Sequence, residues 1–225
     1  MFHKEILSRT GCSSRHLKGR GLTAVIKKNF FPDYVFVSGG AYIPPTEGGV
    51  GWKKKKKKGA NGMARGRLVD NQVRLWIQGK PRNEKKFHLF SRAFIELTKM
   101  LKLTPVGAQV VVREESCNLA TLVDAVFVNS KGKTVVVELK TGFEGYNETS
   151  TGKMRGVFSY LTDCPANQHK VQLALTSAMF EKTFPELGKV EALVIRMTSK
   201  GAHVRGLSDQ VSKTAREILI SGHLS

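Results

Sequence analysis

Residues 135–142 read VVVELKTG, and the interpretation of the whole sequence starts from this stretch. Three consecutive valines are typical of a strand that is buried on both faces. Glu138 and Lys140 follow at the end of the run, two residues apart, so in an extended chain their side chains point to one face. Charged groups at a buried position are costly unless they are paired or functional, so this pair needs an explanation.

The turn before this strand predicts what lies beside Glu138. A three-residue hairpin loop favours a type I turn followed by a left-handed residue, commonly glycine. The residues 130–132, SKG, match this pattern, with the glycine in the left-handed position. Asn129 then pairs with Lys133, and counting back along both strands puts Asp124 opposite Glu138. Directly opposed residues have Cβ atoms about 4.5–5.5 Å apart.

Asp124, Glu138 and Lys140 are therefore expected on one face. Two carboxylates this close repel each other unless a positive charge lies between them. Mg²⁺ takes oxygen ligands from one or two carboxylates together with water and a substrate phosphate, and a neighbouring lysine can polarise the attacking water. The alternative is a buried Asp–Lys–Glu ion-pair cluster, but such clusters seldom stabilise a core better than apolar residues would. We therefore favour a metal site.

The surrounding sequence predicts an α/β fold with a mixed central sheet flanked by helices. Apolar residues recur at helical spacing from Val69 to Ile77 and from Phe90 to Leu101, and TPVG at 104–107 is expected to end the second helix. The other expected elements are strands at 109–114, 120–128 and 133–140, a helix after Pro165, strands at 190–197 and 202–206, and a last helix after Ser208.

LVDAVFV (122–128) and VVVELK (135–140) resemble the core of the PD-(D/E)XK nuclease superfamily, most closely its RecB-type and λ-exonuclease-like branches. The resemblance covers residues 66–198 and implies a restriction-endonuclease-like αβββαβ core. It implies Asp124 and Glu138 as ligands of Mg²⁺, with Mn²⁺ as the alternative cation. It also implies Leu139 as a ligand through its carbonyl and Lys140 as the catalytic lysine.

A second part of the resemblance lies on the expected helix QHKVQLALTSAM (168–179). RecB-type enzymes carry a QxxxY motif on the helix after the lysine strand. Gln172 takes the place of the family glutamine and is implied as a catalytic-site residue, whereas Thr176 replaces the tyrosine, which departs from the motif. Gln168, in the first turn beside Pro165, is expected to be close to solvent and outside the site.

Members of this superfamily often carry a further acidic residue or a histidine on an upstream helix. Asp70 is the first candidate for this additional metal ligand. Glu96, Glu114 and Glu115 remain alternatives, and each of the four, taken alone, is more typical of a solvated charge than of a metal ligand.

The charge of the chain predicts a partner rich in phosphate. Its formal net charge is +19, and residues 1–106 hold 23 Lys and Arg against 6 Asp and Glu, whereas residues 107–225 hold 14 against 12. The cations around the first two helices are expected to contact a nucleic-acid backbone. They are Arg65, Arg67, Arg74, Lys80, Arg82, Lys85 and Lys86.

Two domains are expected: a basic, flexible extension at 1–65, which includes six consecutive lysines at 53–58, and a nuclease domain at 66–225. No apolar run approaches the roughly 18–20 residues that span a membrane, so a soluble protein is expected. The chain holds 3 cysteines without a metal-binding pattern, which is typical of a reduced intracellular protein. The nucleus or the mitochondrion of a eukaryote, or a viral origin, fits this composition.

Together these features predict a Mg²⁺-dependent deoxyribonuclease, an exonuclease or end-processing enzyme of repair, recombination or genome maintenance. DNA that is single-stranded or has free ends is the expected partner. The alternatives are a structure-specific endonuclease such as a junction resolvase, and a non-catalytic basic DNA-binding protein with a nuclease fold. The sequence leaves open exo- or endonuclease action, polarity, the choice of DNA or RNA, strandedness and oligomeric state.

Overall fold

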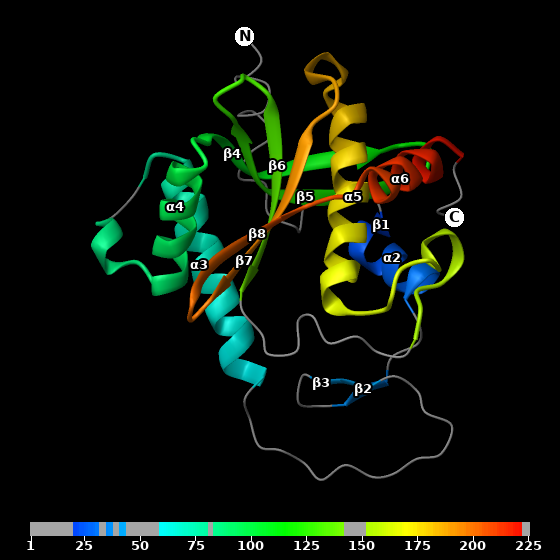
Figure 1. Cartoon of the computed structure of the whole chain (residues 1–225), viewed down its shortest axis with the longest axis horizontal. Coiled ribbons are helices and arrows are strands. Elements are labelled where there is room, and N and C mark those ends of the chain that lie inside the picture. Colours follow the sequence, from blue (N-terminus) through cyan, green and yellow to red (C-terminus); the bar gives the residue numbers. More distant parts are fainter. Residues whose placement is uncertain are drawn as a thin grey trace.

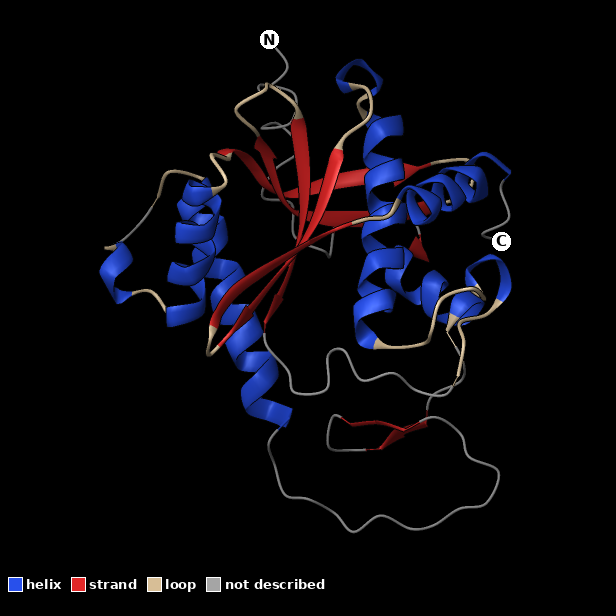
Figure 2. Ribbon diagram, in the orientation of Figure 1, coloured by secondary structure: helices blue, strands red, loops and turns tan. Residues whose placement is uncertain are grey.

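A computed structural model of the chain describes residues 20–31, 35–37, 41–43, 59–80, 83–141 and 152–221. Within these residues a mixed sheet is covered by helices on both faces, as Figures 1 and 2 show. Its strands are β1 (Arg20–Gly21), β4 (Thr104–Glu114), β5 (Leu119–Val128), β6 (Thr134–Thr141), β7 (Glu191–Thr198) and β8 (Gly201–Gly206). The α-helices are α2 (Leu22–Phe30), α3 (Gly59–Ile77), α4 (Leu89–Met100), α5 (Pro165–Thr183) and α6 (Asp209–Ser221).

The smaller elements complete the described chain. Three 3₁₀ turns, η2 (Glu84–Lys86), η3 (Gly156–Phe158) and η4 (Pro185–Leu187), lie in the connections. β2 (Val35–Val37) and β3 (Ala41–Ile43) form a separate two-stranded antiparallel sheet.

In the main sheet, β5 pairs with both β1 and β6 along one edge and with β4 along the opposite edge, and the sheet continues from β6 through β7 to β8. β4, β5 and β6 form an antiparallel meander, β7 runs parallel to β6, and β8 runs antiparallel to β7. A parallel pair needs a crossover connection, and α5 supplies it between β6 and β7. The order α4-β4-β5-β6-α5-β7 confirms the predicted αβββαβ core and the α/β fold class.

The predicted hairpin register is confirmed. The amide of Asn129 donates to the carbonyl of Lys133 at 3.0 Å, and Gly132 has a φ of 75°, as the left-handed turn position requires. The β5–β6 ladder then continues from Val128 and Thr134 back to the pair formed by Ala125 and Val137.

Beyond this pair the two strands separate, and we call the gap between them the fork. β4 occupies one edge of β5 over its whole length, so β1, which pairs with Leu119 and Ala120, lies on the same edge as β6. β6 pairs only from Ala125 onward. The residues between these two pairings include Asp124, which therefore lies where its strand has no ladder partner on this edge.

Strand β5 also changes its packing at Asp124. Val123 belongs to the core on one side of the sheet and Ala125 to the core on the other, although neighbours two apart normally share a face. On β4, Val110 pairs with Val123 and Ala108 pairs with Ala125. The residue between them on β4, Gln109, has a φ of 54°. A non-glycine residue with positive φ marks a local kink, and such kinks often re-aim a side chain near a functional site.

Two hydrophobic cores hold the layers together. Val136 and Val194 face the core formed with α2, α5 and α6, whereas Val135, Val137 and Ile195 face the core formed with α3 and α4. Successive valines of β6 thus enter different cores, which explains why this strand is apolar without alternation. The two helical layers flank the sheet in Figure 1.

Residues 20–31, which the sequence analysis assigned to the flexible extension, are part of the folded domain. Leu22, Val25, Ile26 and Phe30 are buried in the core, and the rings of Phe30 and Phe158 meet edge to face at 5.0 Å. The predicted boundary at residue 65 is therefore wrong for this segment, because its short apolar stripe is buried only through contacts with distant residues. The lysine run at 53–58 lies outside the described residues, and its flexibility remains a prediction.

The start of α3 and the segment that follows α4 also differ from the prediction. α3 begins at Gly59, before the predicted start, and TPVG (104–107) opens β4 instead of ending α4. The ladder with β5 shifts between Pro105 and Gly107. Proline has no N–H to donate and is tolerated in strands at edges and irregularities of this kind.

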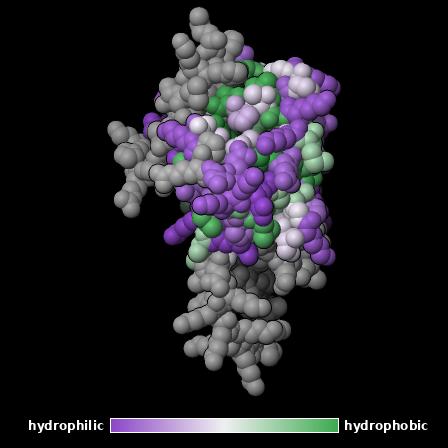
Figure 3. Space-filling view, turned by 90° about the vertical axis from the view of Figure 1, so that its left-hand side faces the viewer, coloured by the Kyte–Doolittle hydropathy of each residue, from purple (hydrophilic) through white to green (hydrophobic). Residues whose placement is uncertain are grey.

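The surface beside α4 is largely hydrophilic, with apolar residues in smaller patches (Figure 3). Arg92, Glu96 and Lys99 are exposed along that helix, and Met100 is exposed at its end. No helix in the described part of the chain is long and apolar enough to cross a membrane.

Candidate active site

Glu138 is the centre of the polar cluster at the fork, and its side chain is only 3% exposed. Its Oε1 accepts a hydrogen bond from the Nζ of Lys140 at 2.5 Å and another from the Nε2 of Gln172 at 2.8 Å. Gln172 lies on α5, so this bond joins the helix to the end of β6. The two contacts fix the position of the carboxylate.

Asp124 is held from the other side of the fork. Its Oδ2 accepts a hydrogen bond from the amide of Leu139 at 2.8 Å. The predicted direct pairing with Glu138 is replaced by this bond, since the ladder ends one residue earlier. The N–H and C=O of one strand residue face the same edge, so the carbonyl of Leu139 also points toward the fork.

The electrostatics of the fork are dominated by carboxylates. Burial raises the pKa of Asp124 well above its ordinary value, and the nearby charge of Glu138 raises it further. The charge of Lys140 and the amide of Leu139 act in the opposite direction, and Asp70 adds a smaller upward effect. Three carboxyl groups thus interact around one ammonium group, which favours binding of an additional cation.

Asp70 is the candidate upstream ligand that the structure brings to this cluster. It lies on α3 and is exposed to solvent, yet partial burial of its carboxyl raises its pKa. Lys140 opposes this shift and Glu138 adds to it, which shows that α3 carries the side chain into the field of the site. The helix also packs against the end of β6, where Gly66 faces the hydroxyl of Thr141.

The other three candidate ligands lie elsewhere. Glu96 is exposed on α4, and Glu115 is exposed in the turn after β4. Glu114 forms an ion pair with Lys182 at 2.8 Å. Lys182 lies ten residues after Gln172 on α5, which corresponds to about 15 Å along the helix.

The two glutamines of α5 have different environments, and that of Gln168 differs from the one expected from the sequence. Gln172 is half-buried and bonds Glu138. Gln168 was expected close to solvent but is only 8% exposed, and its Nε2 donates to Oδ1 of Asp163 at 2.9 Å. The expectation was wrong because the segment before α5 folds back over the first turn of the helix, which sequence periodicity does not reveal.

Two further residues of α5 complete this region. His169 was not singled out from the sequence; burial, and after it the charge of Lys140, hold its pKa well below the ordinary range. Its spacing of three from Gln172 is the signal that places both on one helical face. Thr176, in the position of the family tyrosine, is 1% exposed, and no described group hydrogen-bonds its hydroxyl.

The predicted nucleic-acid contacts divide into separate groups. Arg67 and Arg74 share the helical face of Asp70 by spacing, although Arg74 also bonds Asn71 and Gln78. The guanidinium of Arg65 instead lies over the ring of Phe90 at 5.2 Å, toward α4. Lys80, Lys85 and Lys86 are exposed beyond the C-terminal end of α3, and Arg82 lies outside the described residues.

The donor groups of the fork fit a hard divalent cation. Among the described residues no three His, Cys, Asp or Glu side chains form a complete metal site by themselves. Mg²⁺ commonly uses only one or two carboxylates and completes its shell with water and substrate phosphate. Asp124 and Glu138, with the carbonyl of Leu139 and with Asp70 nearby, supply oxygen donors of this kind.

No protein-family model and no curated protein matches this sequence. Among solved structures, the chain is similar to "Putative exonuclease" from Eubacterium rectale, with a TM-score of 0.40 and 12% identity over 75% of this chain. It spans 65% of the length of that protein. A second similar structure is that of SSO0001, with a TM-score of 0.27 and 17% identity, covering 71% of each chain.

Proposed function

We propose that this protein is a metal-dependent nuclease of the PD-(D/E)XK type that hydrolyses phosphodiester bonds in DNA. The observation that carries the proposal is the convergence of Asp124, Glu138 and Lys140 at the fork, with Gln172 bonded to Glu138. The αβββαβ order and the net charge of +19 agree with it.

Asp124 and Glu138 would hold Mg²⁺ or Mn²⁺, with the carbonyl of Leu139 and the carboxylate of Asp70 as further donors. When bound, such a cation lowers the pKa of a water molecule and neutralises charge on a phosphate. The raised pKa of Asp124 supports this assignment, because the fork holds carboxylates that its own ammonium group does not balance.

The protein's own groups prepare the site before substrate arrives. Gln172 and Lys140 hold Glu138 from two sides, and the amide of Leu139 holds Asp124. Side chains fixed in this way need little rearrangement when charge develops in the reaction. The ammonium of Lys140 can orient the attacking water or stabilise negative charge on the phosphate, and His169 beside it stays neutral near pH 7.

A non-catalytic DNA-binding role fits the fork less well. Carboxylates repel phosphate, so a protein that only binds a polyanion gains nothing from Asp124, Glu138 and Asp70 around one lysine. The resemblance to RecB-type and λ-exonuclease-like enzymes is our basis for proposing DNA ends as the substrate. Repair, recombination or genome maintenance is the corresponding setting.

The test compares the full chain with its Asp124→Asn variant on linear and circular DNA, single- and double-stranded, and on matching RNA. We expect the wild-type protein to cleave DNA with Mg²⁺ or Mn²⁺ and not with EDTA, and an end-directed enzyme to spare circles. Asp124→Asn should bind DNA and fail to cleave it. Equal cleavage by both proteins, or cleavage in EDTA, would exclude the mechanism. DNA binding without cleavage under any metal would favour the non-catalytic alternative.

A further inference from the structure

Strand register continues the site from Lys140 across the next two strands. Lys140 on β6 is the partner of Arg196 on β7, and Arg196 is the partner of His203 on β8. Residues in register on neighbouring strands point to the same face, so the three side chains form a row. Arg205, two residues after His203, points to the same face at the sheet edge.

The face that carries this row is the face of the site. Val136 lies four residues before Lys140 on β6, and Val194 lies two residues before Arg196 on β7, so both valines share the face of the row. They belong to the core beside α5, where Gln172 contacts Glu138. The residues between them, such as Ile195 and Met197, enter the opposite core. Arg196 is half-buried, while His203 and Arg205 are exposed, so the row reaches from the fork to solvent.

The charge on this face changes sign away from the fork. Among the described residues of β6, β7 and β8, Glu138 is the acidic residue on this face; Glu191 lies in register with Val135 and so faces the other core. The remaining charged residues of the row are basic. Nε2 of His203 lies 3.4 Å from the hydroxyl of Thr198, which is a neutral group.

We propose that Arg196, His203 and Arg205 form, with Lys140, a phosphate-binding track that carries the nucleic-acid backbone from the fork over β7 and β8. The inference rests on the proposed nuclease function and names the path of its substrate. Neighbouring strands are about 4.8 Å apart, so the row from Lys140 to His203 spans about 10 Å. At about 3.4 Å of axial rise per nucleotide, this accommodates about three nucleotides of one strand.

The basic side chains of the track would offset the repulsion between the substrate phosphates and the carboxylates of the site. A phosphate that approaches Asp124 and Glu138 is repelled by both carboxylates, and the cations beside the fork compensate for this repulsion on the adjoining phosphates. Arginine suits this role because its guanidinium presents several donors to phosphate oxygens. The path differs from the one predicted along α3, since it crosses the sheet on the side of α5.

The experiment measures binding of short labelled single- and double-stranded DNA to the full chain in EDTA by fluorescence anisotropy. The variants are Arg196→Gln, which keeps a long polar side chain at the half-buried position, and Arg205→Ala at the exposed edge. Arg113→Ala is the matched control, because Arg113 is an exposed cation on β4 outside the row. Salt is varied over about 50–200 mM, where counterion release dominates the affinity.

Each row variant should flatten the slope of log K against log salt by about 0.7 on single-stranded or about 0.9 on double-stranded DNA. Arg113→Ala should leave the slope unchanged. Unchanged slopes for Arg196→Gln and Arg205→Ala, in proteins with wild-type circular dichroism, would overturn the track. Parallel cleavage assays with Mg²⁺ separate the two proposals. Flattened slopes without wild-type cleavage would support the track and reject the nuclease, and cleavage with unchanged slopes would do the reverse.

Discussion

Two buried glutamates lie against the same helix, α5, and each has a lysine partner. Glu138 meets Lys140 near Gln172, and Glu114 meets Lys182 at the C-terminal end of the helix. The glutamate side chains are 3% and 8% exposed, respectively, so burial is nearly the same. Their surroundings differ, and the difference separates a structural ion pair from a candidate catalytic cluster.

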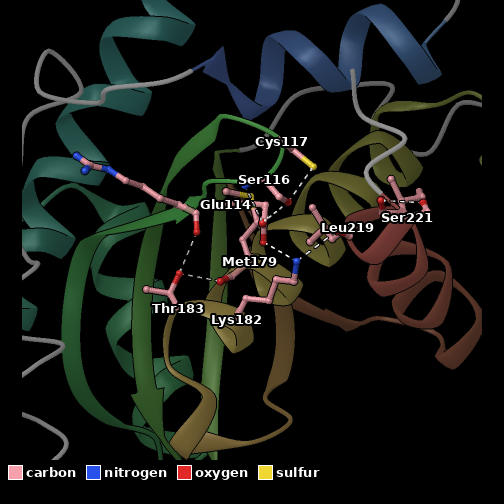
Figure 4. Close-up of polar contacts among 10 residues, drawn as sticks. Glu114, Ser116, Cys117, Met179, Lys182, Thr183, Leu219 and Ser221 are labelled. Carbon is pink, nitrogen blue, oxygen red and sulfur yellow. Dashed lines mark hydrogen bonds and ion pairs between the residues drawn. The ribbon is translucent and has the colours of Figure 1, made fainter.

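Glu114 has its charge balanced by its neighbours. Its Oε2 contacts Nζ of Lys182 at 2.8 Å, and its Oε1 accepts from the hydroxyl of Ser116 at 2.6 Å (Figure 4). Lys182 also donates to the carbonyl of Leu219 at 3.3 Å, which joins α5 to α6. Burial acts to raise the pKa of Glu114, but the bonds from Lys182 and Ser116 outweigh it and lower the pKa below its ordinary value.

The fork shows the opposite balance. Asp124 and Asp70 interact with Glu138, and the pKa of each aspartate is raised, first by burial. Lys140 is the cation that opposes both shifts. An ion pair whose charges balance stabilises the fold by itself. A cluster with more carboxylates than cations has uncompensated negative charge, which favours binding of a metal ion. Three predictions test this contrast.

The largest effect is expected from removing the two lysines in turn. Under the proposed mechanism Lys140→Met should lower the rate of DNA cleavage by about 10³-fold, because charge stabilisation beside the phosphate is lost. Lys182→Met should leave the cleavage rate of the folded protein unchanged. It should lower the free energy of unfolding by about 1–2 kcal/mol, since Glu114 loses a partner that is itself partly exposed.

Single-turnover cleavage at saturating Mg²⁺ and urea denaturation of both variants measure these two quantities. A similar loss of cleavage in both variants would mean that the two pairs do not differ in function. A large loss of stability in Lys140→Met with unchanged cleavage would make the fork a structural cluster.

A smaller effect on turnover and on stability is expected from replacing each of the two glutamines of α5 by alanine. Gln172→Ala should reduce turnover by about ten-fold, equivalent to about 1.4 kcal/mol on the barrier, because Glu138 loses the bond that fixes it. Gln168→Ala should instead reduce stability by about 1–3 kcal/mol, because the buried Asp163 loses a hydrogen-bond donor. The measurements are single-turnover cleavage and denaturant unfolding. A greater loss of turnover in Gln168→Ala would contradict the assignment of Gln172 to the site.

The smallest effect is expected from the pH dependence of stability at Glu114. A glutamate whose pKa is lowered on folding stabilises the folded state above its unfolded pKa, whose ordinary value is 4.5, and this contribution is lost as the pH falls below it. The wild-type protein should therefore lose stability more steeply than Glu114→Gln as the pH is lowered through this range. Unfolding free energies from denaturant titrations at several pH values provide the test. Parallel curves would show that the ion pair contributes no pH-dependent stability.

Local sequence patterns were sufficient to predict the central hairpin and most of the helices and strands. The hairpin after Asn129 was predictable because turn geometry depends on adjacent residues, and Gly132 adopts the required positive φ. The helices and strands after residue 66 were predictable in kind, although TPVG was assigned to the end of a helix instead of the start of β4. The hairpin register brings Asp124, Glu138 and Lys140 close together just beyond its last pair, Ala125 and Val137, although the expected direct pairing of Asp124 with Glu138 is replaced by the bond from Leu139.

Contacts between distant segments were not predictable in this way. The burial of α2 depends on Phe158 and on α5, which lie more than one hundred residues later in the chain, so its short apolar stripe was read as part of an extension. Gln168 is buried because a preceding segment covers it, and periodicity along α5 cannot indicate that. Asp70 could be distinguished from Glu96 and Glu114 only when α3 was placed beside β6.

The sequence by itself determined which groups are available at the fork, since a tight hairpin brings the strand segments that carry two carboxylates and a lysine side by side. The tertiary structure decided how those groups are held. β1 lies on the same edge of β5 as β6, so the strands separate at Asp124 and its carboxylate accepts from Leu139. α5 then brings Gln172 to Glu138, and β7 and β8 add the basic row. Hairpin pairing is a local interaction, whereas the fork, the glutamine and the row depend on packing between segments far apart in the chain.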